Sequence, residues 1–170
     1  MTPADHVVLI GMMGVGKSTV GRLLADRWSR RFVDADDELE GRTGRTVSTL
    51  FTEHGEAGFR RLETDVLVDL LSEESPLVIS CGGGVVTEAA NREVLGDRAT
   101  VVWLTAPVDV LALRVGDGAT RPLLGEEPGA VLEQLVEQRM PLYEAVADHV
   151  VDTADRSPAT VVERVLQVLR

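Results

Sequence analysis

The chain has 170 residues, of which 44% are apolar and 26% charged, a composition that is typical of a globular domain and excludes a disordered chain. Its formal net charge of −11 argues against nucleic acid or an anionic membrane as the main partner, and no apolar run reaches the roughly 20 residues that a membrane helix needs. The N-terminal "MTPADHVVLIG" lacks the layout of a signal peptide and the single cysteine, Cys81, cannot form an internal disulfide, so we expect a cytoplasmic protein.

Strand and helix patterns alternate along the chain. Short apolar or β-branched runs predict strands at 6–10, 31–35, 77–80, 100–104 and 149–152. Helical periodicity predicts helices at 17–30, across 36–74 with breaks near 41–44 and Gly55, from Pro107 onward, at 129–147 and at 157–169. This alternation predicts one doubly wound α/β domain of three layers, spanning 1–170, with a central parallel five-stranded sheet.

The segment "GMMGVGKS" (11–18) matches the phosphate-binding pattern G-x-x-x-x-G-K-[ST] in full, between a predicted strand and a predicted helix. Its glycines allow successive backbone N–H groups to point at one anion, and the start of the helix adds its positive dipole end. We expect Lys17 to bridge the β- and γ-phosphates of a nucleoside triphosphate, Ser18 to ligate Mg²⁺, and Thr19 to touch the α-phosphate. The alternative, a tight glycine turn without a ligand, fits the complete motif less well.

Two classes of P-loop protein are excluded by residues that the sequence lacks. Lys17 is the only lysine in the chain, so the Asn-Lys-x-Asp motif by which GTPases read guanine is absent. The predicted strands at 77–80 and 100–104 end in Ser80–Cys81 and Thr105, whereas motor and AAA-type ATPases carry an acidic pair at such a position. The remaining class is the small-molecule kinases, which must hold an acceptor hydroxyl in line with the γ-phosphate.

Four features provide candidate residues for binding the acceptor. They are Asp34 and Asp36 after the second strand, Arg60 and Glu63 in "GFRRLE", the glycines 82–84 in "CGGGVV", and the arginines Arg121 and Arg139. Carboxylates, a glycine platform and arginines together would suit a small polyhydroxylated acid. We interpret about 36–63 as the substrate-binding helical segment, and the glycine- and proline-containing 116–129 as a mobile lid that carries Arg121.

The three aspartates near the phosphate loop are expected to differ in role. Alternation along an extended segment would place Asp34 and Asp36 on one side and Asp37 on the other, so Asp37 is the predicted cap of the next helix. Each acceptor feature also has an alternative interpretation. An acidic residue after a strand can be a helix cap, and Arg60 can pair with Glu56 one helical turn away. The glycine run can be a flexible turn, and the arginines can be solvated surface.

Several stretches resemble the shikimate kinases, in the same order and across nearly the whole chain: "GMMGVGKSTVGRLLA", "FVDADDELE", "LFTEHGEAGFRRLE", "ISCGGGVV", "RPLL" and "RMPLYEAVADHVVDT". The resemblance implies a P-loop kinase fold like that of the nucleoside monophosphate kinases. It further implies transfer of the γ-phosphoryl group of ATP to the 3-hydroxyl of shikimate, with Mg²⁺ as cofactor, in the biosynthesis of chorismate and the aromatic amino acids.

The resemblance also implies roles for individual residues of this chain. Those implied in catalysis are Lys17, Asp36 and Arg121. Those implied in binding shikimate are Asp36, Arg60, Glu63, Gly82, Gly83, Gly84 and Arg139, with Arg60 and Arg139 on its carboxylate. Those implied in binding ATP are Gly14, Val15, Gly16, Lys17, Ser18, Thr19, Arg114, Arg121 and Arg156. Ser18 is implied as a direct ligand of Mg²⁺, and Asp34 as a ligand acting through water.

Two alternatives to this assignment stay open at the level of sequence. The first is a P-loop kinase for another small acceptor, such as gluconate or a nucleoside monophosphate. The second is a nucleotide-binding module without turnover, which would predict disruption of Lys17, Asp36 or Arg121, and all three are present. We expect ATP and shikimate as small-molecule partners, no nucleic acid or membrane partner, and a monomer.

Overall fold

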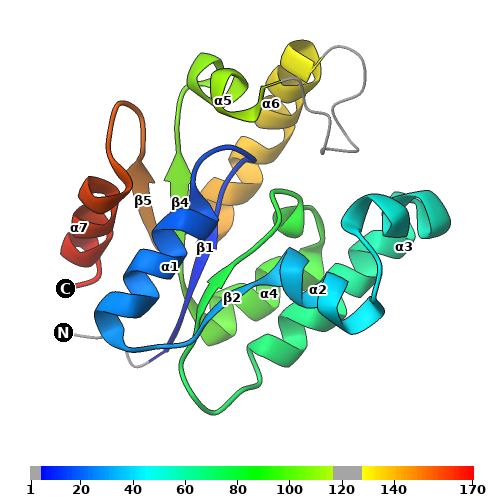
Figure 1. The fold of residues 1–170 in the computed structure, drawn as a ribbon, viewed down its shortest axis with the longest axis horizontal. Coiled ribbons are helices and arrows are strands. Elements are labelled where there is room, and N and C mark those ends of the chain that lie inside the picture. Colours follow the sequence, from blue (N-terminus) through cyan, green and yellow to red (C-terminus); the bar gives the residue numbers. More distant parts are fainter. Residues whose placement is uncertain (1–4, 117–127) are drawn as a thin grey trace.

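The computed structural model describes residues 5–116 and 128–170 (Figure 1). Its strands are β1 (His6–Ile10), β2 (Phe32–Asp34), β3 (Val78–Ser80), β4 (Ala99–Thr105) and β5 (His149–Asp152). Its helices are α1 (Lys17–Trp28), α2 (Ala35–Thr43), α3 (Val47–Leu70), α4 (Ala89–Arg98), α5 (Val108–Val115), α6 (Pro128–Val146) and α7 (Pro158–Val168), with a short 3-10 helix η1 (Val85–Thr87). None of these described helices is long and apolar enough to cross a membrane.

The strands form one five-stranded sheet in the order β2-β3-β1-β4-β5, and every neighbouring pair is parallel. The predicted fold class is therefore confirmed. The register aligns Leu9 of β1 with Ser80 of β3, and Asp34 of β2 with the same Ser80. The carboxyl ends of three adjacent strands thus meet at one edge of the sheet, which is where ligands bind in open α/β sheets.

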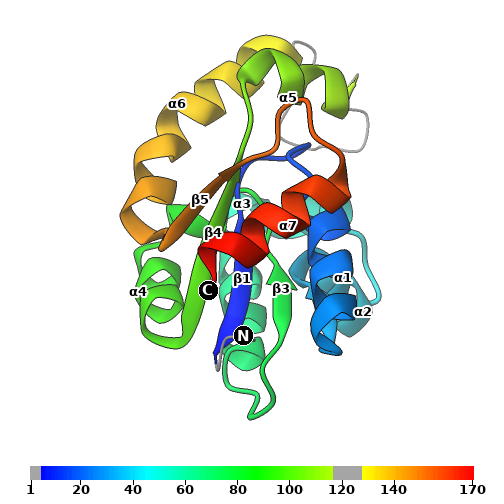
Figure 2. The same ribbon diagram turned by 90° about the vertical axis from the view of Figure 1, so that its left-hand side faces the viewer.

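Helices cover both faces of the sheet (Figures 1 and 2). On one face α1 packs against β3 and against α7, and on the other α4 packs against β4, α3 and α6. The apolar residues of β1 and β3 and the central residues 101–104 of β4 are almost completely buried, as expected for parallel strands covered on both sides. This core holds the edge of the sheet, and the loops that leave it, in fixed positions.

The acidic segment after β2 differs from the sequence prediction. The strand ends at Asp34 and α2 begins at Ala35, and the Asp34 carboxylate accepts hydrogen bonds from the backbone N–H groups of Asp36 (3.1 Å) and Asp37 (3.4 Å). Asp34 is therefore the cap of α2, and the prediction that Asp37 caps it is wrong. The alternation argument also fails, because Asp36 lies in the first helical turn, where the helix dipole favours an acid.

The long helix α3 is interrupted where the sequence predicted a break. Gly55 has φ 67° and ψ 179°, a backbone conformation that glycine adopts and other residues avoid, so the two halves of α3 meet at an angle. Phe51 before the break and Phe59 after it stack with their ring centroids 4.3 Å apart. The second predicted break is also present, since α2 ends at Thr43 and Gly44 follows with φ 67°.

The predicted lid, 116–129, lies almost entirely outside the described residues. Only its ends are described: Gly116 is the C-cap of α5, and α6 begins at Pro128. Arg121 belongs to the part that the structure does not describe. The predicted helix at 129–147 is confirmed as α6, shifted by one residue at each end.

Candidate active site

Residues 11–16 connect β1 to α1 and form the phosphate loop. Gly16, with φ 100°, is the N-cap of α1, and no side chain supplies a cap, so the first N–H groups of the helix are open to a ligand. Gly11 lies so close to β4 that an added Cβ atom would come within 2.2 Å of the Leu104 carbonyl oxygen. The sequence "GMMGVG" therefore folds as a loop that presents backbone N–H groups at the end of the sheet.

Lys17 follows this loop, and its side chain is folded against it. The ammonium group donates hydrogen bonds to the carbonyl oxygens of Gly11 (2.9 Å) and Met12 (3.0 Å). A cavity of about 250 Å³ opens beside it. The cavity is lined by Met13, Gly14, Gly16, Lys17, Ser18, Thr19, Asp34, Asp36, Ser80, Cys81, Gly82, Gly83 and Arg114, and we call it the phosphate cavity.

Three side-chain oxygens gather at the base of the phosphate cavity. The Ser18 hydroxyl donates to Asp34 Oδ2 at 2.5 Å and lies 3.4 Å from the Ser80 hydroxyl. Hard cations such as Mg²⁺ take oxygen ligands and are commonly held by one or two protein groups, water and substrate phosphates. Among the described residues no group of three or more His, Cys, Asp or Glu side chains gathers to hold a metal alone. Ser18 and Asp34 therefore fit a metal that arrives with a nucleotide.

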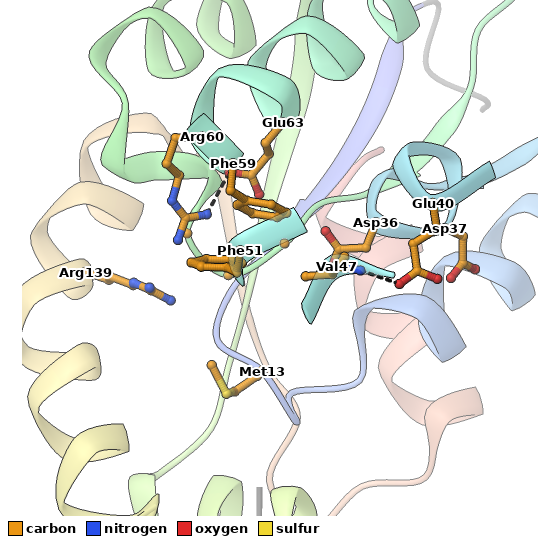
Figure 3. A pocket seen from close by; sticks show the side chains of 13 residues that line it. Met13, Asp36, Asp37, Glu40, Val47, Phe51, Phe59, Arg60, Glu63 and Arg139 are labelled. Atoms are coloured by element: carbon orange, nitrogen blue, oxygen red, sulfur yellow. Dashed lines mark hydrogen bonds and ion pairs between the residues drawn. The ribbon is translucent and has the colours of Figure 1, made fainter. Parts of the chain in front are cut away.

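A second cavity of about 230 Å³ adjoins the first, and we call it the acceptor cavity (Figure 3). Side chains from the phosphate loop, α2, α3, the loop after β3 and α6 converge on it. They are Met13, Asp36, Asp37, Glu40, Val47, Phe51, Phe59, Arg60, Glu63, Gly82, Gly83, Gly84 and Arg139. Figure 3 shows Arg60 and Arg139 toward one side of the cavity and Asp36 toward the other, with Phe51 and Phe59 between them.

Arg60 is 5% exposed and is held by carboxylates of its own helix. Its Nη1 donates to Glu63 Oε2 at 2.8 Å, and its Nη2 donates to Glu56 at 3.4 Å. Burial works to lower the pKa of Arg60, but the carboxylates of Glu63 and Glu56 hold it above its ordinary value. The guanidinium packs directly on Gly84, where an added Cβ atom would lie 2.2 Å from Nη2, so a larger residue there would displace the guanidinium.

Glu63 is 3% exposed, and burial raises its pKa from 4.5 to about 7, although Arg60 opposes the shift. Its Oε1 atom has no hydrogen-bond partner among the described residues. A Cβ atom at Gly82 would lie 2.7 Å from this Oε1 and 3.2 Å from Asp36 Oδ1, so both carboxyl groups face the space above Gly82. An unsatisfied, buried oxygen pointing at this space is costly unless a ligand donates to it.

Arg114 and Arg156, which the resemblance implies in binding ATP, lie beside the phosphate loop. Arg114 donates to the hydroxyl (3.0 Å) and the carbonyl oxygen (2.9 Å) of Thr153, and Arg156 pairs with Asp152 at 3.5 Å. Both line a third cavity of about 210 Å³ together with Gly14, Val15, Gly16, Thr19, Val20, Thr153, Pro158 and Val161. This cavity and the phosphate cavity share Gly14, Gly16, Thr19 and Arg114.

The structure thus brings the described candidate residues into three adjoining cavities. The phosphate and acceptor cavities share Met13, Asp36, Gly82 and Gly83, so these four residues lie where the two meet. Val15 lines the third cavity but neither of the other two. Arg121 lies outside the described residues, so its position relative to the cavities is not assigned.

Sequence reasoning missed several residues that line the site. They are Met13, Asp37, Glu40, Val47, Phe51, Phe59, Ser80 and Cys81. The chain has only three phenylalanines, and two of them flank the predicted break at Gly55, which is a signal that could have identified the stacked pair. Glu40 could not have been found this way, because its role is to accept from the backbone N–H of Val47 at 2.7 Å, across two helices.

A parallel α/β sheet, a phosphate loop at its carboxyl edge and an adjoining cavity with arginines opposite an aspartate define a P-loop kinase for a small molecule. Comparison with known proteins narrows this class. The sequence model of the family described as "Shikimate kinase" matches residues 13–170. A shikimate kinase from Aromatoleum aromaticum is 48% identical over 165 residues, which cover 96% of this chain and 94% of that protein.

Solved structures give the same result. Shikimate kinase from Acinetobacter baumannii in complex with shikimate superposes with a TM-score of 0.94 at 41% identity, covering 97% of this chain and 92% of the other. Shikimate kinase from Aquifex aeolicus superposes with a TM-score of 0.85 at 37% identity, covering 96% and 95%. The chain therefore belongs to the shikimate kinase family. The family suggested by the sequence motifs is confirmed, and with it the enzyme class, an ATP-dependent kinase.

Proposed function

We propose that this protein transfers the γ-phosphoryl group of ATP to the 3-hydroxyl group of shikimate, giving shikimate 3-phosphate and ADP. The observation that carries the proposal is the polarity of the acceptor cavity, with Arg60 and Arg139 on one side and Asp36 on the other (Figure 3). A small acid that carries ring hydroxyls away from its carboxylate fits this arrangement. Its carboxylate would face the two arginines, and one hydroxyl would face Asp36 next to the phosphate cavity.

In this proposal Arg60 and Arg139 bind the shikimate carboxylate, because guanidinium groups form paired hydrogen bonds to carboxylates. Both arginines are buried, so the ion pair forms in a site with little competing water. Phe51 and Phe59 supply an apolar surface for the carbon ring and exclude water from it. Glu63 presents its unpartnered Oε1 atom to a second substrate hydroxyl above Gly82.

Asp36 is proposed to orient the reacting 3-hydroxyl and to accept its proton. The hydroxyl oxygen then bonds to the γ-phosphorus, and the bond from that phosphorus to the β,γ-bridging oxygen breaks, with ADP as the leaving group. Asp36 is suited to this role because it lines both the acceptor and the phosphate cavities. Lys17, at the mouth of the phosphate loop, is proposed to stabilise the negative charge of the phosphates, and we propose the same role for Arg121.

We propose that Ser18 and Asp34 hold Mg²⁺ with the nucleotide, Asp34 through water. When bound, the ion neutralises phosphate charge, which is its general role in phosphoryl transfer. Asp34 is already oriented for this by its bonds to the first turn of α2. The residues proposed to bind the phosphates are Gly14, Val15, Gly16, Lys17, Ser18 and Thr19, and Arg114 and Arg156 are proposed to flank the adenine in the third cavity.

The test is an ADP-release assay with Mg·ATP against shikimate, gluconate and nucleoside monophosphates. We expect ADP release that depends on shikimate, and phosphorus NMR of the product should show one phosphate ester on the 3-oxygen. An analogue that lacks the 3-hydroxyl should bind and inhibit but release no ADP. Turnover of gluconate or of a nucleoside monophosphate in place of shikimate would refute the proposal.

We also propose that the protein acts as a monomer in the cytoplasm. The lone cysteine supports a reducing compartment. Light scattering coupled to size-exclusion chromatography should give a mass close to the 18.4 kDa of one chain. A dimer whose activity is lost on dilution would contradict this part of the proposal.

A further inference from the structure

Tyr143 lies on α6, one helical turn after Arg139, and is 1% exposed. Its ring stacks on Trp103 of β4, with centroids 5.6 Å apart and an angle of 25° between the planes. Two apolar rings in contact fix the position of the side chain, and they leave the hydroxyl group as its only polar part. Neither cavity of the site includes Tyr143 in its lining, so the residue has no direct place in the proposed reaction.

The Tyr143 hydroxyl reaches the loop after β3 and the phosphate loop at once. It donates a hydrogen bond of 2.5 Å to the carbonyl oxygen of Gly83 and lies 3.5 Å from the sulfur of Met12. Burial raises the pKa of Tyr143 well above its ordinary value, although the charge of Arg139 opposes the shift. The phenol therefore stays protonated at any working pH and remains a donor to Gly83.

Gly83 is placed where small displacements would matter. It lines both the phosphate and the acceptor cavities. A Cβ atom added to it would lie 3.3 Å from Arg139 Nη1, 3.4 Å from the Gly11 carbonyl oxygen and 3.5 Å from the Met13 nitrogen. The residue is therefore packed between the arginine proposed to bind the acceptor and the loop proposed to bind the phosphates.

From these contacts we propose that Tyr143 is a positioning residue that fixes the Gly83 peptide as the common wall of the two cavities, and so sets the placement of the acceptor relative to the γ-phosphate. The inference rests on the proposed function, because it assigns the two cavities to shikimate and ATP. Displacing a reacting group by a fraction of an ångström costs rate, since the reaction depends on near-contact geometry. Tyr143 acts through Gly83 and Arg139 and touches neither substrate.

The test compares Tyr143→Phe with a matched control, Asn91→Ala. Both side chains are buried donors to a carbonyl of the same segment, since Asn91 Nδ2 donates to the Val85 carbonyl oxygen at 2.9 Å. Val85 does not line either cavity, so the control removes an anchor of the segment without loosening the common wall. Steady-state kinetics, the affinity for MgADP by calorimetry and the melting temperature are measured for both variants.

We expect Tyr143→Phe to lower kcat/KM for shikimate about tenfold, with KM raised and kcat lowered, because a buried carbonyl loses its donor and the wall shifts. The affinity for MgADP should change less than about twofold, because the phosphates are bound by backbone groups that Tyr143 does not contact. Asn91→Ala should lower the melting temperature and leave KM for shikimate within about twofold of wild type.

Unchanged kinetics in Tyr143→Phe would overturn the inference. So would an equal rise in KM for shikimate in both variants, since any anchor of the segment would then suffice. A fall in kcat and melting temperature at constant KM would mean that Tyr143 only stabilises the fold, and would also overturn it. Failure of the proposed function is read separately, from wild-type protein that releases no ADP with shikimate.

Discussion

The phosphate and acceptor cavities lie side by side but are built in different ways. The phosphate cavity is formed mainly by one continuous loop and by residues at the ends of β2 and β3. The groups that we propose to bind phosphate there are backbone N–H groups, whose direction is set by glycines and by the start of α1. The acceptor cavity is assembled from five separate segments, and the groups that we propose to bind the acceptor are charged side chains, of which Arg60, Glu63 and Arg139 are buried.

We infer that the specificity of the site for its acceptor resides in the acceptor cavity. Backbone N–H groups can bind any polyphosphate. Substituting the side chain of a loop residue leaves most of these N–H groups in place. The acceptor cavity depends instead on Arg60, Glu63 and Arg139, each of which is buried and can be removed by one substitution. Substitutions in the acceptor cavity should therefore affect shikimate and spare the nucleotide, whereas Asp36, which lines both cavities, should affect the reaction itself.

The largest effect is expected for Asp36→Asn. Loss of the group that orients the hydroxyl and accepts its proton should lower kcat by about 10²- to 10⁴-fold. The matched control is Glu38→Gln, since Glu38 lies in the same helix, pairs with Arg42 at 2.9 Å and lines neither cavity. Stopped-flow or coupled ADP-release assays measure both variants. A rate for Asp36→Asn within threefold of the control would remove Asp36 from the reaction.

Arg60→Ala should weaken binding in the acceptor cavity and leave binding in the phosphate cavity unchanged. Removing one partner of a buried charge pair costs roughly 2–5 kcal/mol, so KM for shikimate should rise about thirtyfold or more. The affinity for ATP should be nearly unchanged. Arg61→Ala is the control, because Arg61 is exposed and does not line the acceptor cavity. If Arg60→Ala weakened ATP and shikimate equally, Arg60 would be a structural residue and the proposed division between the cavities would fail.

Glu63, in the acceptor cavity, should make the stability of the protein depend on pH. Its pKa in the folded protein is raised from 4.5 to about 7, so the folded state binds the proton more tightly than the unfolded state. The resulting stabilisation is complete below the unfolded pKa and is lost as pH rises through about 7. Between about pH 5 and pH 8, wild type should lose about 2–3 kcal/mol of stability relative to Glu63→Gln.

Urea unfolding of both proteins across this range measures the difference. Glu56→Gln serves as the control, because Glu56 also contacts Arg60 but lies in the exposed part of α3. Its pH profile should follow that of wild type. If wild type and Glu63→Gln lost stability in parallel as the pH rises, Glu63 would already be ionised across this range, and the assignment of its raised pKa would be wrong.

The sequence predicted much of the fold and of the phosphate cavity because both depend on local patterns. The β-branched runs and glycine loop are contiguous, and the motif at 11–18 specifies its own geometry. Asp36 was placed near the site for a wrong reason, since its position follows from a helix capped by Asp34 and not from strand alternation. The local sequence pattern could not distinguish an extended segment from the first turn of a helix, because an aspartate suits both.

The acceptor cavity could be predicted only in part. Arg60 and Glu63 could be predicted because helical spacing puts them on one face of the helix. In the structure Arg60 donates a hydrogen bond of 2.8 Å to Glu63, as this spacing allows. The contact between Gly83 and Tyr143 joins residues that are 60 apart in the chain and depends on how α6 packs on β4. No periodicity reports such packing, so residues that act through tertiary contacts were the ones missed.

The smallest effect is expected for a substitution that changes the shape of the acceptor cavity and none of its charges. Gly55→Ala forces a side chain into a conformation with φ 67°, which should cost about 1–2 kcal/mol of stability and disturb the stacked Phe51 and Phe59. Gly41→Ala is the matched control, because Gly41 lies within α2 with open space around it and should gain up to about 1 kcal/mol. Thermal unfolding and KM for shikimate measure both variants, and only Gly55→Ala should raise KM. If KM stayed constant while stability fell, the break in α3 would serve the fold alone, and the apolar wall of the acceptor cavity would not depend on it.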